Sequence, residues 1–264
     1  MTRSGRVTIE AELGPTGTVL TRLGSSGLLA ARATPWGVFL VSAGAGPLGG
    51  DELLTEVHVG TAASLLVRTV GAVLARRGPH GRSQSLSTVR AVLDEGAQLT
   101  LVPEPGIAGE GADHRSRLHV VLAPSARLFV RDEIVLGRTG ERPGTWWSDR
   151  TISIGSRPLF VSEIGLGPDA PLWKMPNVLG GAQTQSSLLL VHRDLTGVSS
   201  ETLTCDGAIG ARLPLAGPGV EITAFGSSLQ ACRRVVDKLA EGILSSWPKS
   251  DPGIVRDQLR HQPA

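Results

Sequence analysis

The stretch Asp94-Glu95-Gly96-Ala97-Gln98-Leu99-Thr100-Leu101 places a turn before an alanine and then alternates polar with apolar residues. The same order recurs where Gly60 precedes Ala63-Ser64-Leu65-Leu66-Val67 and where Pro124 precedes Ala126-Arg127-Leu128-Phe129-Val130. Successive alanines are 34 residues (97 − 63) and 29 residues (126 − 97) apart. A recurrence near about 30 residues favours stacked β units with a small residue where the chain bends inward. An ordinary meander of hairpins is the alternative.

Period-two alternation extends over the first two thirds of the chain. Val7 and Ile9 alternate with polar neighbours, and Leu118, Val120 and Leu122 do the same. This alternation is typical of strands. The 34 glycines and 17 prolines supply many turns, while only 3% of the residues are aromatic and none is tyrosine. The sequence therefore predicts a mainly β fold with a core of aliphatic side chains.

One helix is predicted near the end, from Ser228 to Ser246. Ser227 or Ser228 can cap it, and Pro248 ends it. Its apolar positions recur at steps of three or four, at Leu229, Cys232, Val236, Leu239 and Ile243. Such a stripe also fits the groove of a helical partner, so we expect the helix to be a docking element. The polar remainder, 248–264, is expected to be a flexible tail.

Charge and cysteine content exclude several classes. The formal net charge of +2 is too small and too scattered to indicate nucleic-acid binding. Cys205 and Cys232 are the only cysteines, so neither a disulfide framework nor a Cys-x-x-Cys metal site is expected. The N-terminus lacks a signal-peptide pattern, and no apolar run is long enough to span a membrane. We expect a soluble, cytoplasmic protein.

Known catalytic motifs are missing from the sequence. It has no nucleophile elbow, no His-Glu-x-x-His helix and no phosphate-binding loop. His114 and His119 are five residues apart, so on a strand they would face opposite sides and could not share an ion. Two alternatives remain, a metal-dependent enzyme on a β-helix and a ligand-binding β module. The latter usually presents aromatic rows, and Trp146-Trp147 is the only aromatic pair here.

Three motifs occur in a fixed order. They are Gly46-Pro47-Leu48-Gly49-Gly50-Asp51-Glu52-Leu53, then Glu95-Gly96-Ala97-Gln98-Leu99 with Pro103-Glu104-Pro105, then Glu133-Ile134-Val135-Leu136-Gly137-Arg138 with Gly140-Glu141. Together they resemble the UreD/UreH family of urease accessory proteins, over roughly Ala30 to Gly181, with the greatest similarity to members from high-GC actinobacteria. One departure is Gly71-Ala72-Val73-Leu74-Ala75-Arg76, which lacks the lysine and the aromatic residue that many members carry there.

The resemblance implies a fold and a function. The implied fold is a two-layered, solenoid-like β-helical body, here residues 1–226, with a small helical element at 227–247 packed on it. The implied function is urease maturation without catalysis. The protein would dock apo-urease to a UreF-type adaptor and, through it, to a UreG-type GTPase. Nickel would be cargo in transit, with no tightly bound cofactor, and neither nucleic acid nor membrane would be a partner.

Carboxylates near the matched motifs are the candidate nickel contacts. Glu104, Asp132, Glu133 and Glu163 each lie beside apolar residues, where a carboxylate is either paired with arginine or lines a polar path. The transient nickel path predicted from these motifs comprises Asp51, Glu104, Glu133, Glu141 and Glu163. Binding there is expected to be weak and exchangeable. The residues expected to have structural roles are Gly49 and Gly50 in a tight turn, Gly137, and Arg138 paired with Glu141 or an aspartate across the sheet.

Overall fold

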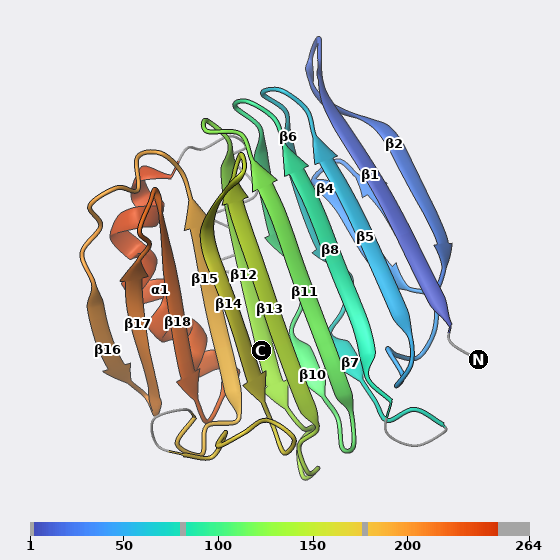
Figure 1. The fold of residues 1–264 in the computed structure, drawn as a ribbon, viewed down its shortest axis with the longest axis vertical. Coiled ribbons are helices and arrows are strands. Elements are labelled where there is room, and N and C mark those ends of the chain that lie inside the picture. The colour runs from blue at the N-terminus through green and yellow to red at the C-terminus, as the bar shows by residue number, and fades with distance from the viewer. Residues whose placement is uncertain (1–2, 80–82, 176–178, 248–264) are drawn as a thin grey trace.

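The computed structural model describes residues 3–79, 83–175 and 179–247, which form two stacked β-sheets and one helix (Figure 1). Sheet A contains, in spatial order, β14 (Arg157–Leu166), β13 (Thr145–Ile154), β11 (Asp113–Leu122), β8 (Ser85–Leu93), β5 (Glu52–Val59), β1 (Ser4–Gly14) and β2 (Gly17–Gly27). Sheet B contains β16 (Glu201–Cys205), β17 (Ala208–Pro214), β18 (Gly219–Gly226), β15 (Thr184–Val191), β12 (Arg127–Leu136), β9 (Gln98–Val102), β6 (Ser64–Thr69), β4 (Gly37–Ser42) and β3 (Leu29–Thr34). Short strands β7 (Val73–Ala75) and β10 (Gly106–Ala108) join it through β12.

The middle of the chain winds as a solenoid. Strands β5, β8, β11 and β13 lie in sheet A and pair in parallel, while β6, β9 and β12 do so in sheet B. Because these seven strands alternate between the two sheets along the chain, one strand of each sheet forms one coil, and the solenoid has about four turns. Antiparallel pairs extend both ends. The predicted mainly β, two-layered solenoid is confirmed.

The alanine repeat marks the corners of the coils. Ala63, Ala97 and Ala126 are all buried, and each stands directly before a strand of sheet B. The Gln98 N–H donates to Ala63 O at 2.8 Å, and the Arg127 N–H donates to Ala97 O at 2.8 Å. The three corners therefore stack in register. The parallel pairing of β6, β9 and β12 shows that the hairpin meander is the wrong alternative.

Helix α1 (Leu229–Ser246) covers part of the outer face of sheet B, over β15, β16, β17 and β18. Ser228 caps it, accepting a bond from the Ala231 N–H. Its apolar stripe is buried against β15, β17 and β18, so the predicted helix is confirmed, but a partner cannot dock on that stripe. Docking through this stripe is therefore the wrong expectation, because the chain's own sheet already covers it, while a role of the helix in partner binding stays a prediction. Within the described ranges no helix is long and apolar enough to cross a membrane, and the predicted tail lies outside them.

A buried ion pair fixes α1 to sheet B. The side chain of Glu133 on β12 is 1% exposed, whereas that of Arg233 on α1 is 23% exposed. Arg233 Nε donates to Glu133 Oε1 at 2.8 Å, and Ser186 Oγ donates to the same oxygen at 3.0 Å. Arg131 on β12 reaches Asp237 on the helix at 2.5 Å. Two strand residues thus pair with two helix residues across the packing interface.

The alternation of β11 separates its two histidines. His119 is exposed, whereas His114 is fully buried, as period-two geometry predicts. His114 Nδ1 lies 2.8 Å from Ser85 Oγ, and its ring centroid lies 4.3 Å from that of Trp146. Burial lowers the pKa of His114 from 6.5 to about 3. This imidazole is therefore a neutral core group and shares no ion with His119.

Removing the helix anchor should cost much stability. In an Arg233→Met variant the buried Glu133 carboxylate keeps the neutral hydrogen bond from Ser186 and a more distant arginine, Arg131, whose Nη1 lies 3.7 Å away. We expect a loss of about 3 kcal/mol in the free energy of unfolding in urea, because a buried charge is left poorly compensated. The Arg234→Met control removes an exposed pair with Asp206 and should cost less than about 1 kcal/mol. Equal losses for the two variants would contradict the anchoring role.

The buried histidine should make stability fall in acid. Between pH 6.5 and about 3 the unfolded chain binds a proton at His114 that the folded chain does not. Stability is therefore lost as pH falls through 6.5, by roughly 2 to 3 kcal/mol at pH 4.5. A His114→Phe variant should show a shallower decline in its free energy of unfolding over this range. His119→Gln should keep the wild-type decline, and identical profiles for both variants would refute this assignment.

Candidate functional site

The Gly49-Gly50-Asp51 turn places the Asp51 carboxylate where it accepts hydrogen bonds from backbone and side chain. Gly50 has a φ of 90°, and a Cβ on Gly49 would lie 2.4 Å from Ser83 O, so both positions favour glycine. Asp51 Oδ2 accepts the Leu48 N–H at 2.8 Å, which confirms the expected turn. Arg3 also donates to both carboxylate oxygens, at 2.9 and 2.6 Å. Asp51 is therefore a turn residue with an arginine partner.

The loop after β12 holds Glu141 in the same way. Gly137 has a φ of 79°, and Arg138 donates from Nε and Nη2 to the Glu141 carboxylate at 2.8 and 3.0 Å. The hydrogen bond from Arg138 holds the pKa of Glu141 low, at about 2. The predicted pairing of Arg138 with Glu141 is confirmed.

Glu104 and Glu133 lie on the outer side of sheet B. Arg68 Nη2 donates to Glu104 Oε1 at 3.2 Å in the link between β9 and β10. Glu133 is the helix anchor described above, and both carboxylates act on the charge of Arg233. These two predicted acids therefore both interact with the charge of Arg233, near the N-terminus of α1.

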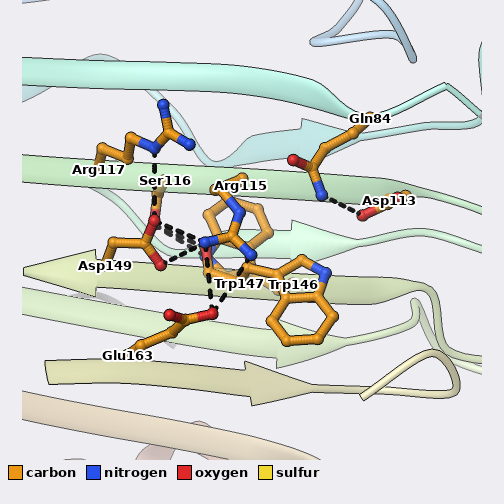
Figure 2. A network of polar contacts seen from close by, with 9 residues as sticks. All are labelled: Gln84, Asp113, Arg115, Ser116, Arg117, Trp146, Trp147, Asp149 and Glu163. Atoms are coloured by element: carbon orange, nitrogen blue, oxygen red, sulfur yellow. Dashed lines mark hydrogen bonds and ion pairs between the residues drawn. The ribbon is translucent and has the colours of Figure 1, made fainter.

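Glu163 belongs to a network on the outer face of sheet A, shown in Figure 2. Arg115 donates to Asp149 at 2.8 and 2.7 Å and to Glu163 at 3.4 Å, across β11, β13 and β14. Its guanidinium carbon lies 5.2 Å from the centre of the Trp147 ring, while Trp146 points inward. The adjacent tryptophans therefore do not form one stacking platform.

The five predicted acids occupy separate places. Each pairs with an arginine, and only Glu104 and Glu133 share a neighbour. Among residues 3–79, 83–175 and 179–247, no group of three or more His, Cys, Asp or Glu side chains could hold a metal ion. The nickel path through these residues therefore stays a prediction.

A buried group of charges lies between the sheets, where sequence analysis placed none. The interior charge cluster consists of Asp132, Ser148, Arg150, Ser187 and Glu221. Arg150 Nη2 lies 2.9 Å from Glu221 Oε1, and the two side chains are 4% and 5% exposed. Arg150 Nη1 donates to Ser187 Oγ at 3.3 Å, and Ser148 Oγ donates to Asp132 Oδ2 at 3.3 Å. Strand β13 of sheet A thus contacts β12, β15 and β18 of sheet B.

The charges of this cluster are incompletely balanced. It contains two carboxylates and one guanidinium, with Phe160 5.1 Å from the Arg150 guanidinium carbon. Burial raises the pKa of Asp132, and it also raises the pKa of Glu221, in both cases against the field of Arg150. Asp132 was noted in the sequence only as a carboxylate beside apolar residues. The pairing of Arg150 with Glu221 could not be predicted from the sequence, because the two residues are 71 positions apart (221 − 150).

Many of the unsatisfied polar atoms in the described ranges face this cluster. Eight buried side-chain atoms there lack a well-directed hydrogen bond, and five of them are Arg150 Nε, Ser162 Oγ, Gln185 Oε1 and both Glu221 carboxylate oxygens, of which Oε1 still forms the ion pair with Arg150. Ser162 lies directly across from Arg150 on β14, and Gln185 is two residues from Ser187 on the same side of β15. Buried polar atoms of native proteins usually find a partner, such as an ordered water or a ligand.

A second polar feature is a depression of about 740 Å³ on the outer face of sheet A, across β1, β2, β5 and β8. Arg6 Nε donates to Glu56 at 2.9 Å, and Arg22 pairs with Glu10 at 3.2 Å. Most of the charged side chains that line the depression are therefore paired with one another. The depression offers a polar contact surface.

Known proteins similar to this chain share one description. A family model described as the UreD urease accessory protein matches residues 3–253. Urease accessory protein UreD of Frankia alni is 36% identical over 247 residues, which cover 86% of this chain and 82% of the relative. Urease accessory protein UreD 3 of Streptomyces griseus is 34% identical, over 88% of this chain and 93% of the relative. Urease accessory protein UreD of Streptomyces coelicolor is 36% identical, over 85% of this chain and 90% of the relative.

The matched residues include the three motifs that carried the resemblance, and the relatives span nearly the same length as this chain. The fold implied by that resemblance is also the fold observed. The chain therefore belongs to the UreD family of urease accessory proteins.

Proposed function

We propose that this chain is a cytoplasmic, non-catalytic maturation factor of urease. It docks apo-urease to a UreF-type adaptor and, through the adaptor, to a UreG-type GTPase whose hydrolysis of GTP releases nickel. The observation that carries the proposal is the family match over residues 3–253, together with relatives of similar length named as urease accessory proteins.

Uncovered parts of the β body support a docking role. Sheet A has no covering element on its outer face within the described ranges, while α1 covers part of sheet B (Figure 1). Strands β2 and β14 are the edges of sheet A, and unpaired strand edges invite association with another chain. Because the apolar stripe of α1 is buried, we assign partner contacts to sheet A and these edges.

Nickel is cargo in this proposal, and the chain retains no tightly bound cofactor. Asp51, Glu104, Glu133, Glu141 and Glu163 remain proposed transient contacts. Each would bind the ion only by releasing its arginine, which favours weak and exchangeable binding.

The alternatives are less well supported. A metal-dependent enzyme needs a convergent set of ligands, and the predicted acids are instead dispersed and paired with arginine. A ligand-binding β module needs an aromatic platform, and Trp146 and Trp147 point to opposite sides of β13.

Reconstitution tests the proposed function directly. Apo-urease, adaptor, GTPase, GTP and nickel would be mixed with and without this chain, and urease-bound nickel and urease activity would be measured. We expect GTP-dependent nickel loading at least about tenfold faster with the chain present, because assembly converts ion transfer into a local step. Equal loading in its absence would refute the proposal.

Near-isosteric variants test the proposed nickel contacts. We expect Asp51→Asn, Glu104→Gln and Glu141→Gln to assemble with the partners yet load nickel at least about tenfold more slowly, since a carboxylate ligand is lost. Complex formation would be measured by gel filtration and urease-bound nickel by elemental analysis. Glu133→Gln should weaken the contact between Glu133 and Arg233 of α1, so we expect this variant to be impaired in complex formation, before nickel loading.

Glu163→Gln tests the fifth proposed contact. The control for loss of charge at an exposed site is Asp194→Asn, because the Asp194 side chain is 72% exposed and is not among the proposed contacts. Normal nickel loading by all three assembled variants would exclude them as contacts. Slower loading by Glu163→Gln alone would shift the path to the outer face of sheet A.

A further inference from the structure

The depression on the outer face of sheet A contains one arginine without an acid. Three arginines line it, Arg6, Arg22 and Arg90. Arg6 donates to Glu56 at 2.9 Å, and Arg22 pairs with Glu10 at 3.2 Å. Arg90 is exposed and forms no hydrogen bond or ion pair with another residue in the described ranges. The depression therefore carries one positive charge that the chain itself leaves unneutralised.

The strand ladder explains why no acid reaches Arg90. Its neighbours at the same level of the sheet are Glu56 on β5 and His119 on β11. Arg6 donates from both Nε and Nη2 to Glu56 Oε2, so this carboxylate is already occupied. His119 is exposed and offers no negative charge. A partner that approaches this face meets a guanidinium with its donors free.

Exposed apolar side chains lie beside this arginine. Val92, two residues further along β8, is 48% exposed, and its register partner Val121 on β11 is 44% exposed. Residues two apart on a strand share a face, so the valines project from the same face as Arg90. Arg90, Val92, His119 and Val121 form what we call the sheet A patch. Arginine is enriched at protein interfaces, where neighbouring side chains exclude water from its contact.

The patch fits an acidic protein surface. A carboxylate would pair with Arg90, while an apolar side chain beside it covers the two valines. A second copy of this chain fits poorly, because the patch contains no carboxylate and two facing copies would bring like charges together. Nucleic acid also fits poorly, because one unpaired cation neutralises too few phosphates.

The surrounding face is large enough for a globular partner. Sheet A has seven strands, and its outer face is uncovered within the described ranges (Figure 1). At a strand spacing of about 4.8 Å this face is roughly 30 Å wide, which accommodates a standard interface of about 800 Å² per partner. Its other charges are mostly paired within the chain, so the unpaired arginine can decide where a partner binds.

We infer that the sheet A patch docks an acidic surface of apo-urease. This inference rests on the proposed function, in which apo-urease has to bind and then leave once it holds nickel. Such a partner needs a reversible contact. A polar face with a single solvated arginine provides one, because a contact of this kind is sensitive to salt and acts mainly on specificity and on the rate of encounter.

Binding of the full-length chain to immobilised apo-urease, measured by biolayer interferometry at low and high salt, tests the inference. We expect Arg90→Glu to bind at least about tenfold more weakly at low salt, because the partner's carboxylate then meets a like charge. Arg90→Gln should bind less weakly and show a smaller dependence on salt. Arg32→Glu is the matched control and should bind like the wild type. Arg32 is exposed on β3 of sheet B and donates to the carbonyl of Ala31.

Unchanged binding of apo-urease by Arg90→Glu overturns the inference, and so does an equal loss in Arg32→Glu. Weaker binding to the adaptor alone, or an altered self-association alone in sedimentation velocity, would give the patch another occupant and overturns it too. Because Arg90 is exposed and unbonded, its variants should keep the wild-type midpoint of unfolding. Should Arg90→Glu unfold, Arg90→Gln replaces it, and wild-type affinity of that variant at low salt overturns the inference.

Docking and maturation separate the two levels of the proposal. If Arg90→Glu docks normally while the chain promotes nickel loading, the inference fails and the proposed function stands. If apo-urease docks through Arg90 but the chain does not promote loading, the docking site stands and the proposed function fails.

Discussion

The backbone ladder at the coil corners is the constraint on which the rest of the structure depends. Gln98 donates to Ala63 O and Arg127 donates to Ala97 O, so each coil takes its register from the one before. Only a small side chain fits where the chain turns inward, and the three alanines there are buried. Because strand side chains alternate, a slip of one residue at a corner would exchange the inner and outer faces of every later strand.

That register gives neighbouring carboxylates on β12 opposite environments. Glu133 points out of the sandwich and is satisfied by Arg233 and Ser186, so its charge serves to hold α1. Asp132 points inward and shares a single arginine with Glu221. Outside the sandwich, then, each predicted acid has its own arginine, and inside it the negative charge exceeds the positive. The excess lies where side chains of both sheets meet.

Whether a feature could be predicted from the sequence depended on how far apart along the chain its interacting residues lie. The corner repeat, the capped helix, the opposite faces of His114 and His119 and the pairing of Arg138 with Glu141 are all local, and all were predicted. Arg233 and Glu133 are 100 residues apart, and Arg115 and Glu163 are 48 apart, so only the register of the folded sheets brings them together. The apolar stripe of α1 predicted only that something covers it, and packing of the helix on the chain's own β body was implied by the family resemblance alone.

The balance of charge inside the sandwich decides how its buried acids are neutralised. Two carboxylates with no cation would be costly to bury and would either take up protons or hold a divalent ion firmly. Two carboxylates with two arginines would leave no uncompensated charge. Arg150 alone, between Asp132 and Glu221, leaves the cluster one positive charge short of neutrality when both acids are ionised. Because burial raises the pKa of Asp132 and of Glu221, a proton held by one of the two acids leaves Arg150 to neutralise the other without any further charge.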